Sequence, residues 1–414
     1  MRAPLCSRDP AELLKPEVIE EPHAFLARLR AEHPVSRVAE TGVHLVASWD
    51  AVVEALQESE GFSANLTGVL MRDAQGQPTV LGFPVTDATQ VIATADEPAH
   101  GVHRQLVLPR LVKPRVAAME PRVRRWAREA VASFLASGGG DFVPLAERLP
   151  ARVIGHLLGL PEGDAERHRA WAMMGGDMLA GNIDEAGMQA LASETGAMAA
   201  YLQEHLEKAQ ARAPYPAEES LLEALAQGVH DGAVTLSQAT GIAIVMFGAG
   251  GESTSALLGS SVRLLCEDPA LAQRLRERPS EIPRFVEEVL RLEPPFKFHY
   301  RAVKRPCKLR GYSLQPGDRL MLLWAAANRD PAVFASPDTL RLDRPHPKHH
   351  MAFGRGAHFC LGSHLARLEA RVVVEEILGA SKRLALVSGS PPVHAPSIFT
   401  RRLERLVVSA EAAA

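Results

Sequence analysis

The chain is most informative at Ala352-Phe353-Gly354-Arg355-Gly356-Ala357-His358-Phe359-Cys360-Leu361-Gly362. Gly354 and Gly356 precede the cysteine, and glycine adopts backbone angles that are closed to other residues. We therefore expect a tight loop around the sulfur of Cys360. A lone cysteine is usually a buried, inert thiol, so a chemical role for this sulfur depends on the residues around it.

A helix is expected to follow the cysteine, over residues 361–377. Its apolar residues Leu365, Leu368 and Val372 recur three and four apart, which is the spacing of one helical face. The free N–H groups and the positive dipole end of a helix that begins at the cysteine would stabilise a thiolate at Cys360. A thiolate held in this way is a strong axial ligand for haem iron.

The overall charge is nearly balanced. The chain has 46 lysines and arginines against 49 aspartates and glutamates, a formal net charge of −3, which removes the bulk electrostatic case for binding nucleic acid. The four cysteines, at 6, 266, 307 and 360, are too few and too scattered for a disulfide framework or a zinc site. We therefore expect a protein of the reducing cytoplasm.

No membrane segment is expected. Residues 1–10 carry charge and proline without an apolar core, unlike a secretion signal or a membrane anchor. The longest uncharged stretch, residues 232–251, contains polar residues and runs directly into Glu252. This pattern favours a buried helix of a soluble protein over a membrane span.

Helical periodicity dominates the first two thirds of the chain, and strand character appears mainly late. The predicted helices include 123–136, 166–180 and 185–211, the last ending before Pro214 and Pro216; a hairpin joins 35–38 to 43–47 ahead of a helix capped by Ser48 or Asp50; short strands occupy 319–325 and 403–409. No linker, repeat or break in composition divides the chain. We expect one mainly α domain over residues 1–414 with minor antiparallel β-sheets.

A long helix is also predicted, from a capping box at residues 235–238 to about Cys266. Its middle contains Gly248, Gly250 and Gly251, each of which costs about 0.5–1 kcal/mol relative to alanine. Such a loss of local stability is expected at a functional site. Without side chains at Gly250 and Gly251, this helix can lie close to a flat ligand.

The cysteine loop reads Phe-Gly-x-Gly-x-His-x-Cys-x-Gly, which resembles the haem-ligand loop of cytochromes P450. The resemblance extends over most of the chain, because further signatures of the family occur in the expected order, and some phrases are similar to an orphan bacterial subfamily. It implies the P450 fold, with haem b (iron protoporphyrin IX) bound through Cys360 as the ligand of the iron. It also implies a monooxygenase that inserts one oxygen atom of O2 into a small apolar organic substrate.

The same resemblance assigns further residues. Glu288-Val289-Leu290-Arg291 is similar to the family's Glu-x-x-Arg motif, whose two side chains share one helical face. The resemblance implies that this pair is buried, is joined by Arg344 and locks the segment that leads to the loop. The other residues implied to hold the haem are His100, Arg104, Arg301 and His358 at its propionates and Phe353, Gly354 and Gly362 in the loop.

Ala249-Gly250-Gly251-Glu252-Ser253 resembles the oxygen-activating signature of the family, with Ser253 where threonine is usual. The resemblance implies that Glu252 exchanges protons with solvent and that either Ser253 or Thr254 relays them. Serine lacks the methyl group that restricts the rotamers of threonine, so its hydroxyl is expected to be less firmly aimed.

The substrate pocket is expected, by family position, to draw on residues 64–91, 171–182, 295–298 and 397–399. An apolar, aromatic lining is predicted, although the same aromatic residues would also suit a core. The predicted lining residues are Phe247, Gly250, Phe296, Phe298, Ile398 and Phe399. Lys297 or Arg72 would meet an acidic group of the substrate.

The electrons are expected from a separate protein. The chain has no nucleotide-binding fingerprint and no cysteine-rich iron–sulfur segment, and the resemblance implies a ferredoxin with its NAD(P)H reductase. A basic docking face on the thiolate side, or else a merely solvated surface, is formed by Arg110, Lys113, Arg115, Arg355 and Arg367. Two alternatives stay open: a peroxide-driven oxygenase, favoured by the serine at 253, and a haem-binding sensor without turnover.

Overall fold

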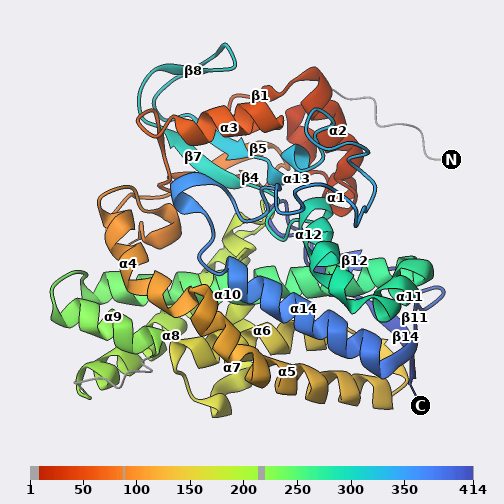
Figure 1. Cartoon of the computed structure of the whole chain (residues 1–414). Coiled ribbons are helices and arrows are strands. Elements are labelled where there is room, and N and C mark those ends of the chain that lie inside the picture. Colours follow the sequence, from red (N-terminus) through yellow and green to blue (C-terminus); the bar gives the residue numbers. More distant parts are fainter. Residues whose placement is uncertain (1–8, 87–88, 213–219, 414) are drawn as a thin grey trace.

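The computed structural model describes residues 9–86, 89–212 and 220–413, and helices dominate them. Figure 1 shows a helical part crossed by the long helix α10 and, above it, a part that contains most of the strands and the N-terminal helices. The α-helices are α1 (Pro16–Glu20), α2 (His23–Glu32), α3 (Trp49–Gln57), α4 (Ala99–Leu111), α5 (Lys113–Ala136), α6 (Val143–Leu158), α7 (Ala165–Ala172), α8 (Glu185–Gln210), α9 (Leu221–His230), α10 (Leu236–Glu267), α11 (Pro269–Glu277), α12 (Ile282–Leu292), α13 (Trp324–Ala327) and α14 (Ser363–Ala380). Short 3-10 helices are η1 (Pro10–Leu14), η2 (Ile92–Thr94), η3 (Glu162–Asp164), η4 (Asp177–Leu179), η5 (Pro279–Glu281) and η6 (Gly356–His358).

The strands form small sheets. They are β1 (Val35–Val38), β2 (Val43–Val46), β3 (Phe62–Ser63), β4 (Gly68–Arg72), β5 (Pro78–Gly82), β6 (Gly139–Asp141), β7 (His299–Val303), β8 (Cys307–Leu309), β9 (Tyr312–Leu314), β10 (Arg319–Leu322), β11 (Ser381–Leu386), β12 (Val393–His394), β13 (Leu403–Arg405) and β14 (Val407–Ala412). The largest sheet has the order β1-β2-β10-β7-β3. Among the described strands the pairing is antiparallel except between β10 and β2, so the predicted minor antiparallel sheets contain one parallel pair.

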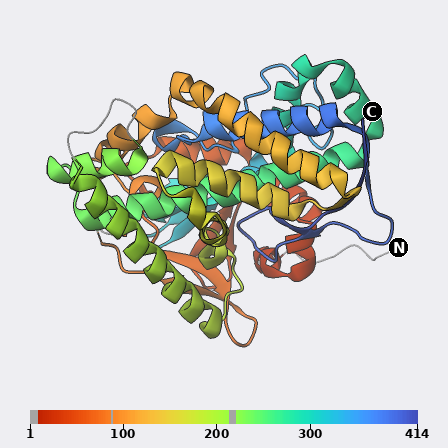
Figure 2. The same cartoon turned by 90° about the horizontal axis from the view of Figure 1, so that it is seen from below.

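Helix α10 runs through the middle of the helical part (Figures 1 and 2), where it packs against α6, α14 and α8. Within the described residues it is the one helix long and apolar enough to cross a membrane, but 67% of its most apolar window is buried inside the protein. A helix that is apolar on most sides and buried is a core helix. A separate apolar cluster lies between the N-terminal helices and the largest sheet.

Two glycines of α10 let neighbouring backbone come close. A Cβ atom on Gly248 would lie 2.8 Å from the Cα of Gly175, and one on Gly251 would collide with the Cβ of Ala172. Gly251 therefore faces α7 and not a ligand, which corrects the expectation that both Gly250 and Gly251 make room for one. Tight packing against neighbouring segments therefore explains the glycines at 248 and 251.

Several local predictions are confirmed. The hairpin pairs Val35 with Val46 through Val38 with Val43. Of the two candidate caps for the next helix, Ser48 is the one whose side chain accepts a hydrogen bond, from the Ala51 amide. The capping box at the start of α10 is present in both directions. These features depend on neighbouring residues alone, which is why the sequence predicts them well.

Other boundaries are wrong. The helix predicted over 166–180 ends at Ala172, and three residues later Gly175 lies against Gly248 of α10. The strand predicted over 319–325 ends at Leu322, where Leu323 leads into α13. The helix predicted from 123 begins earlier, at Lys113, and the strand predicted over 403–409 is divided into β13 and β14. Pro214 and Pro216 lie outside the described residues.

Candidate functional site

A cavity of about 210 Å³ lies between α10 and the loop that carries Cys360. Residues of α4, α6, β7 and α14 complete its wall. Most lining side chains are apolar, and six are basic, four of which form the group described below. An enclosed apolar cavity with a few convergent polar groups is typical of a cofactor or small-molecule site.

The loop around Cys360 is tight, as its glycines predict. Gly354 and Gly356 have φ angles of +65° and +77°, in the left-handed region that favours glycine. The Cys360 amide donates a hydrogen bond to the Phe353 carbonyl at 2.9 Å. The guanidinium of Arg367 lies 4.4 Å from the centre of the Phe353 ring, a cation–π contact. These contacts fix the sulfur at the cavity wall.

The helix after the cysteine begins at Ser363, two residues later than predicted. Burial raises the pKa of the Cys360 thiol, whereas the amides of Gly362 and Ser363 and the charge of Arg367 lower it. The predicted stabilisation of a thiolate by the helix N-terminus is therefore present but smaller than the effect of burial. A metal cation bound to the sulfur would supply the remaining stabilisation.

Four basic side chains gather at the cavity: His100, Arg104, Arg301 and His358. The rings of His100 and His358 lie 4.0 Å apart, and Arg104 donates to the Phe359 carbonyl at 3.0 Å. All four are residues that the sequence analysis assigned to haem propionates, and they come from α4, β7 and the cysteine loop.

Of this basic group, His100 has a carboxylate partner, Glu97 Oε1 at 2.8 Å from its Nδ1, whereas the other three residues have no ion pair with a described carboxylate. Nδ1 of His358 is buried without a hydrogen-bond partner, and burial followed by the charge of Arg301 lowers the pKa of His358 to about 3. Burial also lowers the pKa of Arg301 to about 10, although Asp96 opposes it. A haem with its iron at Cys360 and its carboxylates among these donors fits the cavity, because it would pair the buried basic groups and fill the apolar part.

Comparison with known proteins agrees with this donor set. The family model described as "Cytochrome P450" matches residues 165–382. Cytochrome P450 144 of Mycobacterium tuberculosis is 38% identical over 399 residues, which cover 95% of this chain and 90% of that protein. The chain belongs to the cytochrome P450 family. Membership implies a haem monooxygenase that uses oxygen, an organic substrate and a redox partner.

Solved P450 structures have the same fold. CYP109E1 from Bacillus megaterium, in complex with testosterone, has a TM-score of 0.82 and 27% identity, covering 95% of this chain and 99% of that one. P450BioI, in complex with an acyl carrier protein that carries hexadec-9Z-enoic acid, has a TM-score of 0.85 and 25% identity at the same coverage. A further relative, compared by sequence alone, is the cyclomarin C epoxidase CymV of Salinispora arenicola. It is 29% identical over 371 residues, which cover 89% of this chain and 91% of that protein.

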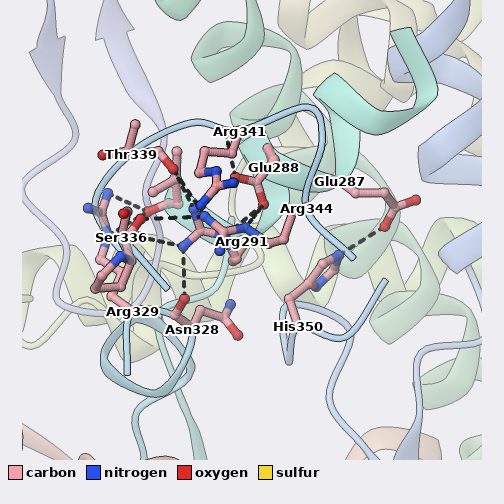
Figure 3. Close-up of polar contacts among 12 residues, drawn as sticks. Glu287, Glu288, Arg291, Asn328, Arg329, Ser336, Thr339, Arg341, Arg344 and His350 are labelled. Carbon is pink, nitrogen blue, oxygen red and sulfur yellow. Dashed lines mark hydrogen bonds and ion pairs between the residues drawn. The ribbon is translucent and has the colours of Figure 1, made fainter. Parts of the chain in front are cut away.

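A buried charge network in this P450 holds the segment that leads to the cysteine loop (Figure 3). Glu288 accepts hydrogen bonds from Arg291 Nε at 2.7 Å and from Arg344 Nε at 2.9 Å. The exposed fractions of Glu288, Arg291 and Arg344 are 0%, 0% and 5%, so this network is part of the core. The two guanidiniums also donate to backbone carbonyls of Asn328, Ala335, Pro337 and Thr339. The structure thus contains the pairing that the sequence predicts.

A second network beside it was missed by the sequence analysis. Glu287 accepts from Arg367 Nε at 2.7 Å and lies 2.9 Å from His350 Nε2 (Figure 3 shows the histidine). Burial raises the pKa of Glu287, but the contacts with His350 and Arg367 outweigh it and the pKa is lowered. Arg367 in turn stacks on Phe353, so this network positions the loop under the cavity. Only the adjacency of Glu287 to Glu288 could have drawn attention to it.

Two hydroxyl-bearing residues of α10, Ser253 and Thr254, line the cavity. Ser253 Oγ donates to the carbonyl of Ala249 at 2.6 Å, a bond that serine often makes within helices. This bond aims the Ser253 hydroxyl, so its orientation is better defined than the absence of a methyl group predicts. The one hydrogen of the Ser253 hydroxyl is thus held by its own helix, and the relay roles of Ser253 and Thr254 stay predictions.

Glu252 borders a different cavity, of about 430 Å³, between α10, η4, α8 and residues 395–404. Its side chain is 1% exposed, and Oε1 lies 3.5 Å from Arg402 Nε. Burial raises the pKa of Glu252 to about 7; Arg402 opposes this shift and Asp177 adds to it. Glu252 therefore borders a cavity distinct from the one at Cys360, and its carboxyl can take up a proton near neutral pH.

The structure brings Gly250 and Phe296 to the cavity wall, but not the other four residues predicted to line it. Phe247 is 0% exposed and packs edge-on against His168 at 5.5 Å. The remaining three, Phe298, Ile398 and Phe399, belong to the apolar cluster under the largest sheet. These four residues are core, which is the alternative that the sequence left open.

Phe298 was predicted to line the cavity, but the residue after it does so instead. Successive side chains of a strand point to opposite faces. Phe298 and Tyr300 pack edge-on at 5.2 Å inside the core, whereas His299 and Arg301 line the cavity. The sequence identified the segment but not the face that each residue presents.

Neither side chain predicted to meet an acidic substrate does so at this cavity. Lys297 is buried elsewhere and donates from Nζ to the Ser397 carbonyl at 2.6 Å. Arg72 lies on β4 outside the cavity wall. Residues 171–182 contribute to the cavity at Glu252 instead, through Met174, Asp177, Ala180 and Asn182. The lining residues that sequence reasoning missed include Ile92, Ile154, Leu157, Val245, Met246, His299, Trp324 and Glu369.

The predicted docking face is smaller than expected. Lys113, Arg115 and Arg355 are exposed. The prediction does not hold for Arg367. Its guanidinium pairs with Glu287 and stacks on Phe353, so it presents little charge at the surface. Arg110 is half-buried, and burial lowers its pKa.

Proposed function

We propose that this P450 binds haem b through Cys360 and inserts one oxygen atom of O2 into a small apolar organic substrate. The supporting observation is a single cavity at which the cysteine, four basic side chains and two hydroxyl-bearing residues of α10 meet. When bound, thiolate-ligated haem supplies the activation of O2. The residues of the chain hold the cofactor, bind substrate, exclude water and deliver protons.

Each group then has a role. His100, Arg104, Arg301 and His358 hold the carboxylates of the haem, and Phe353, Gly354 and Gly362 form the loop beneath it. Gly250 lies at the cavity wall, where a Cβ atom would lie 3.0 Å from the side chain of Ile154. Apolar residues such as Val245, Met246 and Phe296 bind an apolar substrate and exclude water.

Protons are proposed to come from the cavity at Glu252. Its carboxyl takes a proton there and passes it across α10 to the hydroxyl of Ser253 or Thr254, which delivers it at the cavity of Cys360. The desolvated setting of Glu252 supports this role, because a general acid works best with a pKa near the working pH.

The pH dependence follows from the pKa of Glu252, about 7. The carboxyl is protonated below that pH and ionised above it, so the fraction of electrons recovered in product is expected to fall above pH 7, approaching tenfold per pH unit. Glu252→Gln should remove this decline and lower turnover about 100-fold at pH 6. Product formed per NAD(P)H consumed is the measurement. Glu404→Gln, at the same cavity, is the control; a variant at 252 with the wild-type pH profile would contradict the role.

A ferredoxin with an NAD(P)H reductase is the proposed electron source, and Lys113 and Arg115 are proposed to contact it. Both are exposed at the start of α5. The double alanine variant should be reduced several-fold more slowly at low salt and at the wild-type rate at high salt, because salt screens exposed charges. Lys308→Ala, on the exposed strand β8, is the matched control. Stopped-flow reduction with unchanged salt dependence would remove these residues from the docking face.

The function is tested by a spectral screen of purified protein against terpenoid, fatty-acid, steroid and aromatic molecules. A substrate-dependent spin shift, with labelled oxygen from O2 appearing in product when ferredoxin and reductase are supplied, supports the proposal. Equal rates with peroxide favour a peroxide-driven oxygenase. A haem–thiolate spectrum without any spin shift or turnover favours a sensor. We also propose one domain over residues 1–414, because no linker or break in composition divides the chain, and a cytoplasmic location, which the few scattered cysteines support.

A further inference from the structure

His299 shares a wall of the cavity with Arg301 but has no role in the proposed function. It begins strand β7, two residues before Arg301, and both residues line the cavity. Side chains at alternate positions of a strand lie on the same face. The imidazole is therefore built into the wall that also carries a proposed carboxylate-binding group.

The hydrogen bond from Trp324 fixes the tautomer of His299. Indole Nε1 donates to His299 Nδ1 at 2.7 Å, and an indole nitrogen can only donate. Nδ1 must therefore carry no hydrogen. Burial and then the charge of Arg301 lower the pKa of His299 to about 3, so the ring is neutral at physiological pH and its one hydrogen is on Nε2.

The ring is also held in place. Phe296 and Phe399 pack edge-on against it, with ring centres at 5.8 Å and 5.6 Å, and such contacts restrict a buried ring. Among the described residues, no protein group hydrogen-bonds to Nε2; the hydrogen bond at Nδ1 is the one made by this ring. The ring lies at the wall of the cavity, where Nε2 has no protein partner among the described residues. A molecule bound in the cavity can therefore supply the acceptor for this N–H.

We infer that His299 donates a hydrogen bond from Nε2 to an oxygen acceptor of a molecule bound in this cavity. The acceptor is either a carboxylate of the haem or a carbonyl or hydroxyl oxygen of the substrate. This inference rests on the proposed function of the cavity. In the second case, His299 selects oxygenated substrates over hydrocarbons of the same shape, because a hydrocarbon that covers this N–H would exclude water from it and leave it unpaired.

The tautomer is tested first, by nitrogen NMR of histidine-labelled holoprotein in its reduced, carbon monoxide-bound, diamagnetic state. We expect a neutral His299 ring with its hydrogen on Nε2 between pH 6 and pH 8. Trp324→Phe frees Nδ1 and should give a mixture of both tautomers. A wild-type ring with its hydrogen on Nδ1, or a protonated ring, would overturn the inference whatever the enzyme oxidises.

Two arms then identify the acceptor with His299→Phe, which keeps a ring but has no donor. If it is the haem carboxylate, this variant loses native haem to a haem acceptor protein about 3- to 10-fold faster than wild type but loses haem dimethyl ester at an unchanged rate. If it is the substrate, the preference for a steroid ketone over its deoxo analogue falls about 3- to 10-fold in spectral titrations, with unchanged haem loss.

His299→Gln restores an N–H near the position of Nε2 and should recover whichever property was lost. His349→Phe, a histidine that packs on Trp49 outside the cavity, is the matched control. If neither haem loss nor the ketone preference changes in His299→Phe, the inference is wrong. Failure of the wild-type chain to bind haem would instead contradict the proposed function, and the tautomer of His299 would then be measured on the haem-free chain.

Discussion

The Cys360→Ser variant is expected to lose the thiolate-type carbon monoxide spectrum and all monooxygenase turnover. Serine is close to cysteine in size, and the loop bond from the amide of residue 360 to the Phe353 carbonyl does not involve the side chain. The change therefore removes the sulfur and keeps the loop. A serine hydroxyl keeps its proton where a thiol gives it up, so it cannot supply the same anionic ligand.

The measurement is the difference spectrum of the reduced protein with carbon monoxide, together with its haem content. Cys307→Ser, at a half-buried free thiol on β8, is the control and should keep the wild-type spectrum. A wild-type spectrum in Cys360→Ser would refute the ligand assignment and the proposed function with it.

The Glu288→Ala variant is expected to prevent folded, haem-containing protein from accumulating. It leaves the guanidiniums of Arg291 and Arg344 buried without their carboxylate. Breaking a buried charge pair by removing one partner costs about 3–5 kcal/mol, a large share of the stability of a typical domain. The segment that these arginines anchor leads directly to the cysteine loop, so haem binding should be lost with it.

Yield of soluble haem protein and the midpoint of chemical unfolding are the measurements. Glu281→Ala removes a carboxylate that pairs with Arg274 at 2.6 Å on the surface, and exposed pairs are worth about 1 kcal/mol or less. This control should fold and bind haem normally. Equal stability of the two variants would contradict a structural role for the Glu288 network.

The sequence predicts best what depends on nearby residues. The capping box of α10, the hairpin at 35–46 and the glycine-rich turn before Cys360 follow from local chemistry, and the structure contains all three. The buried network of Glu288 was available only through resemblance to the family, because spacing alone cannot separate a buried pair from an exposed one.

The errors share a cause, which is that distant partners decide them. Gly251 packs on Ala172, and Arg367 pairs with a carboxylate 80 positions earlier in the chain. Phe298 was predicted to line the cavity and His299 was missed, because nothing local tells which side chains around the start of β7 meet the cavity. Substrate-lining residues are the hardest to predict, since they come from six or more separate segments.

Helix α10 has one further consequence. Ser253 lines the cavity of Cys360, while its neighbour Glu252 borders the other cavity, and adjacent residues of a helix point about 100° apart. A single helix thus separates the cavity at Cys360 from the cavity at Glu252. Protein engineers could alter the protonation of Glu252 through Asp177 while the shape of the cavity at Cys360, and with it substrate selection, stays intact.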